Sequence, residues 1–441
     1  MLSSILFLLL FGIAVYFFAK KVKEVNRNIN LGRDVNLNDH KSARWKTMAR
    51  VALGQSKMGT RPIAAFFHVL IYVGFIIINI EVLEIIIDGI FGTHRILSFM
   101  GSFYNFLIGS FEILAVGVLA ACFVFLSRRN ILKLKRFWMR EMTSWPRSDA
   151  NIILVVEILL MSAFLLMNAT DHQLQLNGSE HYTNANGIIG SFPVSSFLLP
   201  FISGISTSGL ILLERTCWWF HIIGILAFLN YVPYSKHLHI LLAFPNTYYS
   251  NLKPKGEFTN MQSVTNEVKL MLDPSAIVPP IDTNATPQRF GAKDVQDLTW
   301  KQLMDSYSCT ECGRCTSVCP ANITGKLLSP RKIMMDTRDR LEEVGKNIDK
   351  NKTLTDDGKT LLNDYITPEE LWACTSCNAC VQACPVNIDP LSIIIDMRRY
   401  LVMEQSSAPA ELNGMFTKIE NNGAPWQFSP ADRLNWATEE N

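Results

Sequence analysis

The sequence CTECGRCTSVCP occupies residues 309–320, and CTSCNACVQACP occupies residues 374–385. Each is a C-x2-C-x2-C-x3-C-P run, in which three closely spaced cysteines are followed by a fourth and then by proline. This spacing lets three thiolates from one tight loop hold three irons of a 4Fe-4S cube. The two runs hold eight of the ten cysteines in the chain. The sequence therefore predicts two 4Fe-4S clusters.

Where two such runs occur together, the fourth cysteine of each run ligates the cluster of the other run. We therefore expect two ligand sets that each draw on both runs. The first set is Cys309, Cys312, Cys315 and Cys384, and the second is Cys374, Cys377, Cys380 and Cys319. The repeat continues beyond the cysteines, with matching residues at Pro330 and Pro390, Ile333 and Ile393, Asp336 and Asp396, and Arg338 and Arg398.

Two other uses of cysteine fit these runs less well. A zinc site needs one set of four ligands, usually two C-x2-C pairs, and two four-cysteine runs exceed that need. Disulfides require an oxidising compartment, whereas the topology derived below places this segment in the cytoplasm. Cys122 and Cys217 lie in apolar stretches, where a buried free thiol is the ordinary expectation.

The composition points to a membrane protein. At 441 residues and 49% apolar content, with a positive mean hydropathy, the chain is too apolar for an ordinary pair of soluble domains. The net charge is only +2, and the basic residues cluster in particular loops instead of forming a general basic surface. We therefore expect no nucleic-acid partner.

Five apolar runs have the length of membrane spans. They are Leu2–Ala19, Ile63–Ile87, Phe103–Leu126, Ile152–Ala169 and Gly209–Val232. The first has Lys20 and Lys21 directly after it and no basic residue before it, which is typical of an anchor with its N-terminus outside rather than of a secretory signal. The apolar stretch Gly187–Ser203 is short and contains two prolines, so we expect an interfacial or re-entrant piece there.

Charge in the loops predicts the orientation. Residues 20–61 hold eleven Lys and Arg against three acidic residues, residues 128–149 hold seven against two, and residues 170–208 hold no Lys or Arg. By the positive-inside rule the two basic loops are cytoplasmic, and five spans then deliver the cysteine runs to the cytoplasm as well. We expect a multi-pass protein of the bacterial inner membrane. A sixth span would move the clusters outside and would contradict the charge bias.

These features define the predicted architecture, which is all-α: a five-helix transmembrane bundle followed by a cytoplasmic α-helical dicluster ferredoxin domain. The expected parts are a transmembrane haem b domain at 1–243, a linker at 244–292, the ferredoxin domain at 293–405 and a docking tail at 406–441. The tail has too little apolar material for a core of its own.

Four histidines of the membrane half are candidates for haem binding. His68 lies in the second apolar run and His221 in the fifth, while His237 and His239 follow the fifth run at its cytoplasmic end. Polar residues inside a bilayer are costly and mark functional sites, and two histidines from facing helices hold a haem iron from both sides. We expect His68 and His239 to hold one haem. His221 precedes His239 by five helical turns, about 27 Å, and would serve a second haem, with a packing role as its alternative.

Buried carboxylates are further candidates. Glu112 and Glu157 fall inside spans three and four, where they either handle quinone protons or act as neutral packing partners. Glu81, Glu84 and Glu214 lie closer to the outer interface. Arg314 and Arg331 lie near the cysteines, where they either raise a cluster potential by their charge or are solvated on the surface.

The membrane half resembles a known family. The segment PYSKHLH at residues 233–239, with His221 on the preceding helix, is similar to the end of the last haem-bearing helix in the gamma subunit of respiratory nitrate reductase. That subunit also has five spans, and its two b haems take two ligands from this helix and two from the second span. The resemblance implies that His221, His239 and His68 bind haem b, one or two in number. The second ligand on span two would fall near Ile78, which cannot bind iron.

The cysteine-containing half resembles the membrane-bound iron-sulfur oxidoreductases related to heterodisulfide reductase and to ETF:menaquinone oxidoreductase. The shared stretches are residues 290–300, 309–320, 324–326, 329–332, 371–374, 396–399 and 421–426. In that family a haem span, a dicluster ferredoxin and a cysteine-rich CCG domain often form one chain. This sequence has no Cys-Cys pair and no Cys after Cys384, so the resemblance implies a separate subunit with the CCG domain.

The sequence and the resemblance together predict an electron-transfer subunit of a quinone-linked oxidoreductase. It would pass electrons between cytoplasmic 4Fe-4S clusters and the menaquinone pool through haem b. The expected partners are membrane lipid, quinone, and the CCG-domain subunit and/or a soluble electron carrier. The alternative is a non-enzymatic membrane redox sensor or assembly anchor. A self-sufficient reductase is disfavoured, because the sequence has no nucleotide-binding glycine motif.

Overall fold

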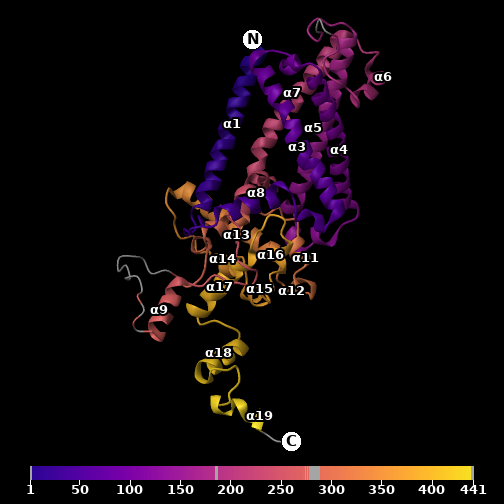
Figure 1. Ribbon diagram of the computed structural model, residues 1–441. Helices are drawn as coiled ribbons and strands as arrows, with labels where there is room; N and C mark the ends of the chain where they lie inside the picture. The colour runs from indigo at the N-terminus through magenta and orange to yellow at the C-terminus, as the bar shows by residue number, and fades with distance from the viewer. Residues whose placement is uncertain (1, 184–186, 274, 276, 278–288, 439–441) are drawn as a thin grey trace.

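The computed structural model describes residues 2–183, 187–273, 275, 277 and 289–438. It has a bundle of long helices at one end and a cysteine-bearing half, residues 289–405, at the other (Figure 1). Among the described residues, pairing of extended backbone is limited to isolated bridges, between Arg33 and Thr299 and between Leu362 and Ile366. The predicted all-α class is confirmed.

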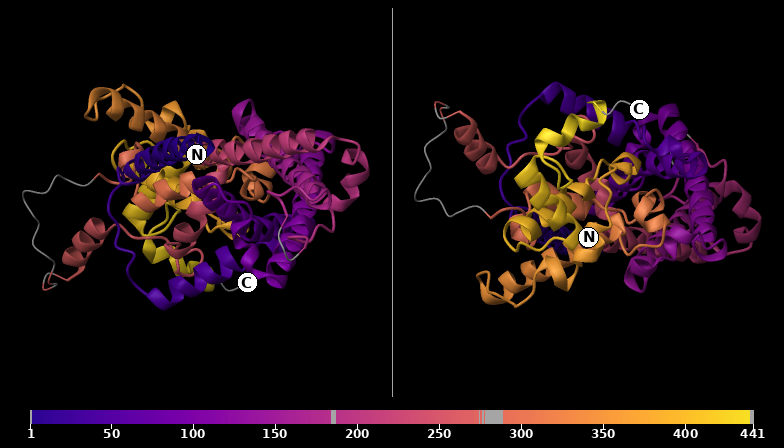
Figure 2. Two further views of the ribbon diagram at one scale, coloured as in Figure 1. Left: turned by 90° about the horizontal axis from the view of Figure 1, so that it is seen from above. Right: turned by 90° about the horizontal axis from the view of Figure 1, so that it is seen from below.

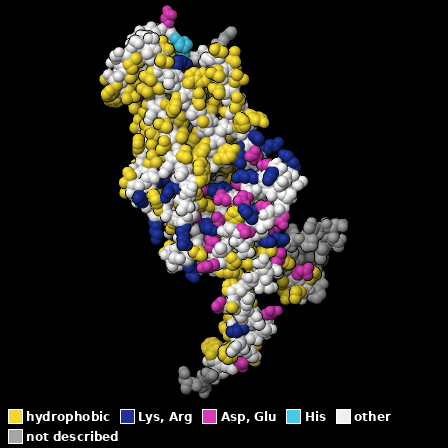
Figure 3. Space-filling view, turned by 180° about the vertical axis from the view of Figure 1, so that it is seen from behind, with side chains coloured by type: hydrophobic (Ala, Val, Ile, Leu, Met, Phe, Trp, Pro, Cys, Tyr) yellow, Lys and Arg dark blue, Asp and Glu magenta, His cyan; other side chains and the backbone are white. Residues whose placement is uncertain are grey.

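Five helices are long and apolar enough to cross a membrane, as predicted. They are α1 (Leu2–Ile29), α3 (Pro62–Phe91), α4 (Ser102–Leu126, continued to Ile131), α5 (Trp145–Leu176) and α7 (Thr207–Tyr231, continued to Tyr234). Pro62 stands at the first position of α3, where its missing N–H breaks no helical hydrogen bond. Apolar side chains cover the outside of the bundle (Figure 3), which is the surface that lipid covers.

The five helices form a closed ring in which each packs against the next. The pairs are α1 with α3, α3 with α4, α4 with α5, α5 with α7 and α7 with α1 (Figure 2). Glycines allow close approach, since a Cβ on Gly89 of α3 would lie 2.9 Å from the ring of Phe7 on α1. Likewise, a Cβ on Gly224 of α7 would lie 2.6 Å from Leu160 on α5. Because α3 and α7 are not neighbours in this ring, they face each other across its interior.

We call the end of the bundle away from the cysteine-bearing half the distal end. A short helical segment covers this end. This segment contains a 3₁₀ turn (Ser195–Leu198) and α6 (Leu199–Ile202). Glu112 of α4 is fully buried and accepts hydrogen bonds from the backbone N–H groups of Val194 (2.8 Å) and Ser195 (3.0 Å), and from the Asn168 amide (3.2 Å). Both carboxylate oxygens of Glu112 therefore have partners, and its choice between the two predicted roles stays a prediction.

At the opposite end, α1 continues past Ala19 to Ile29 and packs against α10 (Trp300–Ser308) and α13 (Pro330–Asn351). Asn28 donates a hydrogen bond to the Tyr307 hydroxyl at 3.0 Å. A Cβ on Gly345 would lie 2.6 Å from the Asn28 amide, so α13 approaches α1 closely at this point. The first span thus continues into the cysteine-bearing half instead of ending at the membrane.

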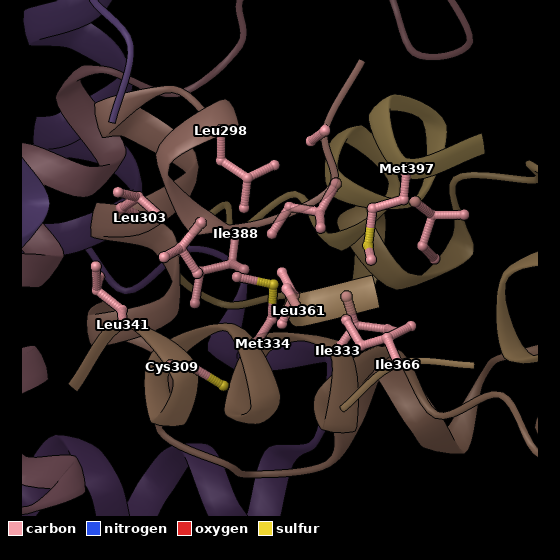
Figure 4. Close-up of a cluster of buried hydrophobic side chains, with 14 of the residues drawn as sticks. Leu298, Leu303, Cys309, Ile333, Met334, Leu341, Leu361, Ile366, Ile388 and Met397 are labelled. Carbon is pink, nitrogen blue, oxygen red and sulfur yellow. The ribbon is translucent and has the colours of Figure 1, made fainter. Parts of the chain in front are cut away.

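The cysteine-bearing half is a small helical domain around one apolar core. Besides α10 and α13 it contains α11 (Arg314–Ser317), α12 (Pro320–Ile323), α14 (Leu361–Asp364), α15 (Pro368–Trp372), α16 (Ala379–Ala383) and α17 (Pro390–Met403). Its core includes Leu303, Ile333, Leu361 and Met397, with Cys309 at its edge (Figure 4). The domain also covers Val25 and Ile29 of α1, so the two halves share this core.

Further helices lie outside these two parts. They are α2 (Lys41–Met48), α8 (His239–Tyr248), α9 (Gln262–Leu272), α18 (Ala410–Asn422) and α19 (Asn435–Thr438). Residues 274, 276 and 278–288 of the expected linker and residues 439–441 of the expected tail lie outside the described residues. The division at 243, 292 and 405 stays a prediction.

The contact of Gly89 with Phe7 leads to a stability prediction. Gly89→Ala must displace the buried Phe7 ring, and overpacking of this kind costs about 1–3 kcal/mol. Gly12→Ala on α1 is the matched control, because its Cβ would meet nothing within 4 Å. In thermal unfolding of the detergent-solubilised protein, we expect a lower midpoint for the first variant and no decrease for the second. Equal midpoints would contradict the packing described here.

Candidate functional site

The two cysteine runs form loops of the same local shape. In each run the residues on either side of the second cysteine have positive φ: Glu311 (53°) and Gly313 (68°) in the first, Ser376 (56°) and Asn378 (57°) in the second. Left-handed conformations are rare for residues other than glycine and cluster at functional sites. Here they fold the chain tightly back on itself, which turns three cysteines of one run toward one side.

The elements around the loops repeat as well. A helix that begins with a capping box leads into each run, formed by Thr299 and Gln302 before the first run and by Thr367 and Glu370 before the second. After each run a longer helix begins at a proline, α13 at Pro330 and α17 at Pro390. These two helices pack together, and so do α11 and α16, which carry cysteines of the two runs. This packing confirms the internal repeat and brings the runs side by side.

The packing brings the fourth cysteine of the second run to the first run. Cys384 lines a cavity of about 380 Å³ together with Cys309, Cys312 and Cys315. Burial raises the pKa of both Cys309 and Cys384 to about 12. Thiols of this kind become thiolates when a metal displaces their protons.

The other four cysteines form a second group. Cys374 is close enough to Cys319 and Cys377 for their charges to interact, and Cys380 is likewise close to Cys374 and Cys319. Cys380 is buried whereas Cys377 is exposed, so this group reaches the surface of the protein. The two groups have the composition expected from crossed ligation.

The spacing of the thiols argues against zinc. Among the residues that the structure describes, no three Cys, His, Asp or Glu side chains stand close enough together to hold one metal ion. A zinc site would place its donors about 2.0–2.3 Å from one point. The first four thiols instead line one shared cavity.

Two arginines of the cysteine-bearing half, Arg331 and Arg314, bind loops of the bundle beside the first cysteine group. Arg331 is 0% exposed and donates hydrogen bonds to Glu141 (2.8 Å) and to the Arg136 carbonyl (2.6 Å), both from the loop between α4 and α5. Arg314 is 5% exposed and donates to the Lys57 carbonyl at 3.1 Å, just before α3. The alternative of a solvated surface role for these two arginines is therefore wrong.

A buried ion pair joins the first cysteine loop to the end of α7. The Lys236 ammonium lies 2.7 Å from Glu311, and the Arg338 guanidinium lies 2.8 Å from the other oxygen of the same carboxylate. Burial opposes ionisation of Glu311, but the charges of Lys236 and Arg338 outweigh it and lower the pKa of Glu311. Lys236 belongs to the same short segment as His237 and His239, so the first cysteine group lies beside the candidate histidines.

The structure brings three of the four histidines together. His68 on α3 is near enough to His239 for their charges to interact, and the rings of His237 and His239 lie 5.8 Å apart between centroids. His239 Nδ1 lies 2.8 Å from the Lys236 carbonyl. His221 is buried deeper in the bundle, with Nδ1 3.1 Å from the Leu160 carbonyl. Since a carbonyl only accepts, both rings carry their proton on Nδ1 and leave Nε2 free.

Sequence reasoning missed the residues that join the two halves, chiefly Lys236, Glu311 and Glu141. A signal for one of them was present, because Glu141 and Asp149 are acids in an otherwise basic loop. Both have basic or backbone partners: Glu141 binds Arg331, and Asp149 accepts from the Lys236 backbone N–H at 3.1 Å.

Comparisons with known proteins identify the cysteine-bearing half. A family model described as "4Fe-4S dicluster domain" matches residues 308–388. The "Probable iron-sulfur-binding oxidoreductase FadF" of Bacillus subtilis is 29% identical over 99% of this chain and 61% of its own length. The "EtfAB:quinone oxidoreductase" of Syntrophomonas wolfei is 25% identical over 92% of this chain and 55% of its own. No solved structure matches the chain.

Another relative matches a smaller share of the chain. One subunit of the ferredoxin/F420H2-dependent CoB-CoM heterodisulfide reductase of Methanosarcina acetivorans is 34% identical over 27% of this chain and 60% of its own length. The chain spans less than two thirds of the length of the two relatives above. The resemblance noted for the cysteine-containing half is confirmed: this chain contains a 4Fe-4S dicluster domain and is similar to iron-sulfur oxidoreductases and to heterodisulfide reductase subunits.

Proposed function

We propose that this protein is a membrane electron-transfer subunit of a larger oxidoreductase complex. It passes electrons between two cytoplasmic 4Fe-4S clusters and the menaquinone pool through haem b. The observation that carries this proposal is the contact between Lys236 and Glu311 at 2.7 Å, which joins the histidine segment to the first cysteine loop. Two candidate redox sites that are held together by a buried contact suit electron transfer between them.

The first cluster is held by Cys309, Cys312, Cys315 and Cys384, and the second by Cys374, Cys377, Cys380 and Cys319. The shared cavity of the first four thiols and the proximity of the others support this assignment. The first set lies under the loops of the bundle, since Arg331 and Arg314 reach from its cavity to those loops. The second set includes the exposed Cys377. A soluble electron carrier therefore meets the second cluster, and the first faces the membrane.

His68 and His239 hold a b-type haem between α3 and the first residue of α8, near the cluster end of the bundle. Two features support the fit. His239 donates Nδ1–H to a backbone carbonyl, as metal-binding histidines commonly do. His68 Nδ1 is buried without a hydrogen-bond partner among the described residues, so this ring gains from a ligand. A haem bound here supplies a one-electron redox centre within the bundle.

His221 has the same Nδ1 contact to a carbonyl as His239 and is proposed to hold a second haem closer to the distal end. Its partner on α3 is not provided by Ile78, which is an apolar residue of the bundle core. We therefore propose one haem held by His68 and His239. A second haem at His221 needs another axial ligand in addition to His221.

The cysteine-bearing half is proposed to face the cytoplasm of a bacterial inner membrane, with the N-terminus outside. The basic loops lie at the same end of the bundle as the cysteines, since Arg61 donates to Ser317 at 2.7 Å and Arg136 accepts from Arg331. The positive-inside rule assigns such loops to the cytoplasm.

The C-terminal tail is proposed to bind a separate iron-sulfur subunit with a cysteine-rich CCG domain. Its large apolar side chains are exposed, namely Phe416, Ile419, Trp426, Phe428 and Trp436. Exposed aromatic residues in such number are typical of the centre of a protein interface.

Crossed ligation predicts which cluster each variant loses. Cys319→Ser is expected to damage the second cluster and Cys384→Ser the first, because each fourth thiol serves the other run. The wild type should contain about eight irons per chain in its clusters, and Cys122→Ser, a buried thiol away from both groups, is the control. Iron analysis and EPR of the reduced protein measure this. One zinc per chain, or damage confined to the run that carries each mutation, would contradict the assignment.

Axial ligation predicts the spectra of the histidine variants. His68→Ala and His239→Ala should abolish a low-spin b-type haem spectrum, because the iron loses one of its two axial ligands. His237→Ala is the matched control, since its ring lies next to His239 but packs edge-on against Phe228. Absorbance spectra and haem content of purified protein are the readout. A spectrum that survives the first two changes and disappears with the third would exclude this ligand pair.

The proposed tail contact is tested by truncation after Gly414 and by the double variant Trp426→Ser and Trp436→Ser. Both should keep the iron content and the haem while the partner protein no longer copurifies, because the exposed aromatic contact is removed. Glu420→Ala, a polar change on the same tail, is the control. Native mass spectrometry measures the assembly. A partner that remains bound after truncation would show that the tail is not the contact.

A further inference from the structure

A second cavity lies at the distal end of the bundle, away from both cysteine groups. It is lined by residues of α3, α5 and α7 and of the loop after α3. The lining contains five acidic residues, two arginines and one histidine, together with Ile85, Met167 and Trp218. So many ionisable groups between membrane-spanning helices are costly and need a reason.

Arg95 lies at the centre of a hydrogen-bond network among these groups. Its side chain is buried and donates to Asp171 at 2.5 Å, to the Tyr104 hydroxyl at 3.1 Å and to Asn168 at 3.0 Å. Tyr104 in turn donates to Glu84 at 2.9 Å. One buried guanidinium thus organises side chains from α3, α4 and α5 into a connected network.

The remaining acids of the cavity have partners too, with one exception. Asp88 accepts from the Arg95 backbone N–H at 2.8 Å, and Glu214 accepts from the Tyr182 hydroxyl at 2.9 Å. Glu81 is 4% exposed, and its Oε2 makes no hydrogen bond to any residue that the structure describes. A buried carboxyl oxygen without a partner costs free energy unless something else satisfies it. Glu81 is therefore available to a ligand of this cavity.

The chemistry of the lining selects the ligand. Five acidic residues against two arginines disfavour an anion. A metal ion is also disfavoured, because no group of three Cys, His, Asp or Glu side chains in the described part of the chain is suited to hold one. A neutral ring with polar oxygens fits better, since Trp218 and Ile85 offer apolar surface and Glu81 offers a hydrogen-bonding oxygen. A quinone or quinol head group has this chemistry and reaches the site from the membrane.

We propose that this cavity binds the head group of a quinol, and that Glu81 accepts one of its protons when it is oxidised. This inference rests on the proposed function and specifies its quinone site. Oxidation of the quinol breaks two O–H bonds and gives the quinone, two electrons and two protons. One proton goes to the Glu81 carboxylate. The second goes to water at the distal surface, where His94 of the cavity lies 5.6 Å, ring to ring, from the exposed His181.

The electrons go to the one-electron acceptors of the same chain, which under the proposed function are haem b and then the clusters. The position of the cavity suits this transfer. His221, a proposed haem ligand, follows the cavity residue Trp218 by one helical turn on the same side of α7. Quinol oxidation at the distal end and clusters at the other end would separate proton release from electron delivery across the bundle.

The test uses the full chain in detergent, a reduced short-chain naphthoquinol as electron donor and the matching naphthoquinone for equilibrium binding. In Glu81→Gln, reduction of the redox centres by the quinol should slow by on the order of 100-fold, the usual effect of losing a general base. Reduction by dithionite, cofactor content and binding of the quinone should stay near the wild-type level. Glu180→Gln, an exposed carboxyl outside the cavity lining, is the control and should leave the quinol rate unchanged.

A second variant tests binding without changing a charge. Ile85→Phe fills part of the cavity and should weaken binding of the naphthoquinone at least about tenfold, with cofactor content retained. Wild-type quinol rates in Glu81→Gln, or wild-type binding in Ile85→Phe, would overturn the inference. If the wild-type protein itself is not reduced by the quinol although dithionite reduces it, the proposed function fails, and that result is distinct from the failure of this site.

Discussion

The arrangement of the two halves depends on the buried carboxylate of Glu311. It stands in a left-handed position of the first cysteine loop and binds Lys236 from the end of α7 and Arg338 from α13. Removing one partner of such a buried pair costs roughly 3–5 kcal/mol, because a charge is left unpaired. Its side chain is 4% exposed, so salt screens the pair far less than a surface pair. The loop around the first cysteine group is thereby fixed to the segment that carries His237 and His239.

The two ends of the bundle use buried charge differently. Near the clusters, the carboxylates Glu311, Glu141 and Asp149 all have cationic or backbone partners, which makes that end a permanent contact. At the distal end, Arg95, Tyr104 and Tyr182 donate to the other acids of the cavity, whereas Glu81 Oε2 has no partner among the described residues. Complete pairing stabilises a fixed structure, whereas an unpaired group beside a cavity is available to a ligand. This contrast holds for the carboxylates; Arg136 near the first cysteine group also has buried side-chain nitrogens without a partner among the described residues.

Several features follow from the sequence alone, because they depend on residues near one another in the chain. The cysteine spacing sets the shape of each loop, and Pro330 and Pro390 mark the first residues of the two helices that follow. The five spans follow from runs of apolar residues, although α1 extends to Ile29, beyond its apolar run, since packing on α13 and not hydropathy decides where that helix ends.

Other features were decided only by the tertiary structure, because they join residues far apart in sequence. The motif predicted that Cys384 would join the first set, but the cavity it shares with Cys309 depends on the packing of α11 against α16. No local sequence pattern predicts that Lys236 pairs with Glu311. None predicts that Glu81 lacks a hydrogen-bond partner. The partners of a buried carboxylate come from all the helices packed around it. The local sequence does not show which helices these are.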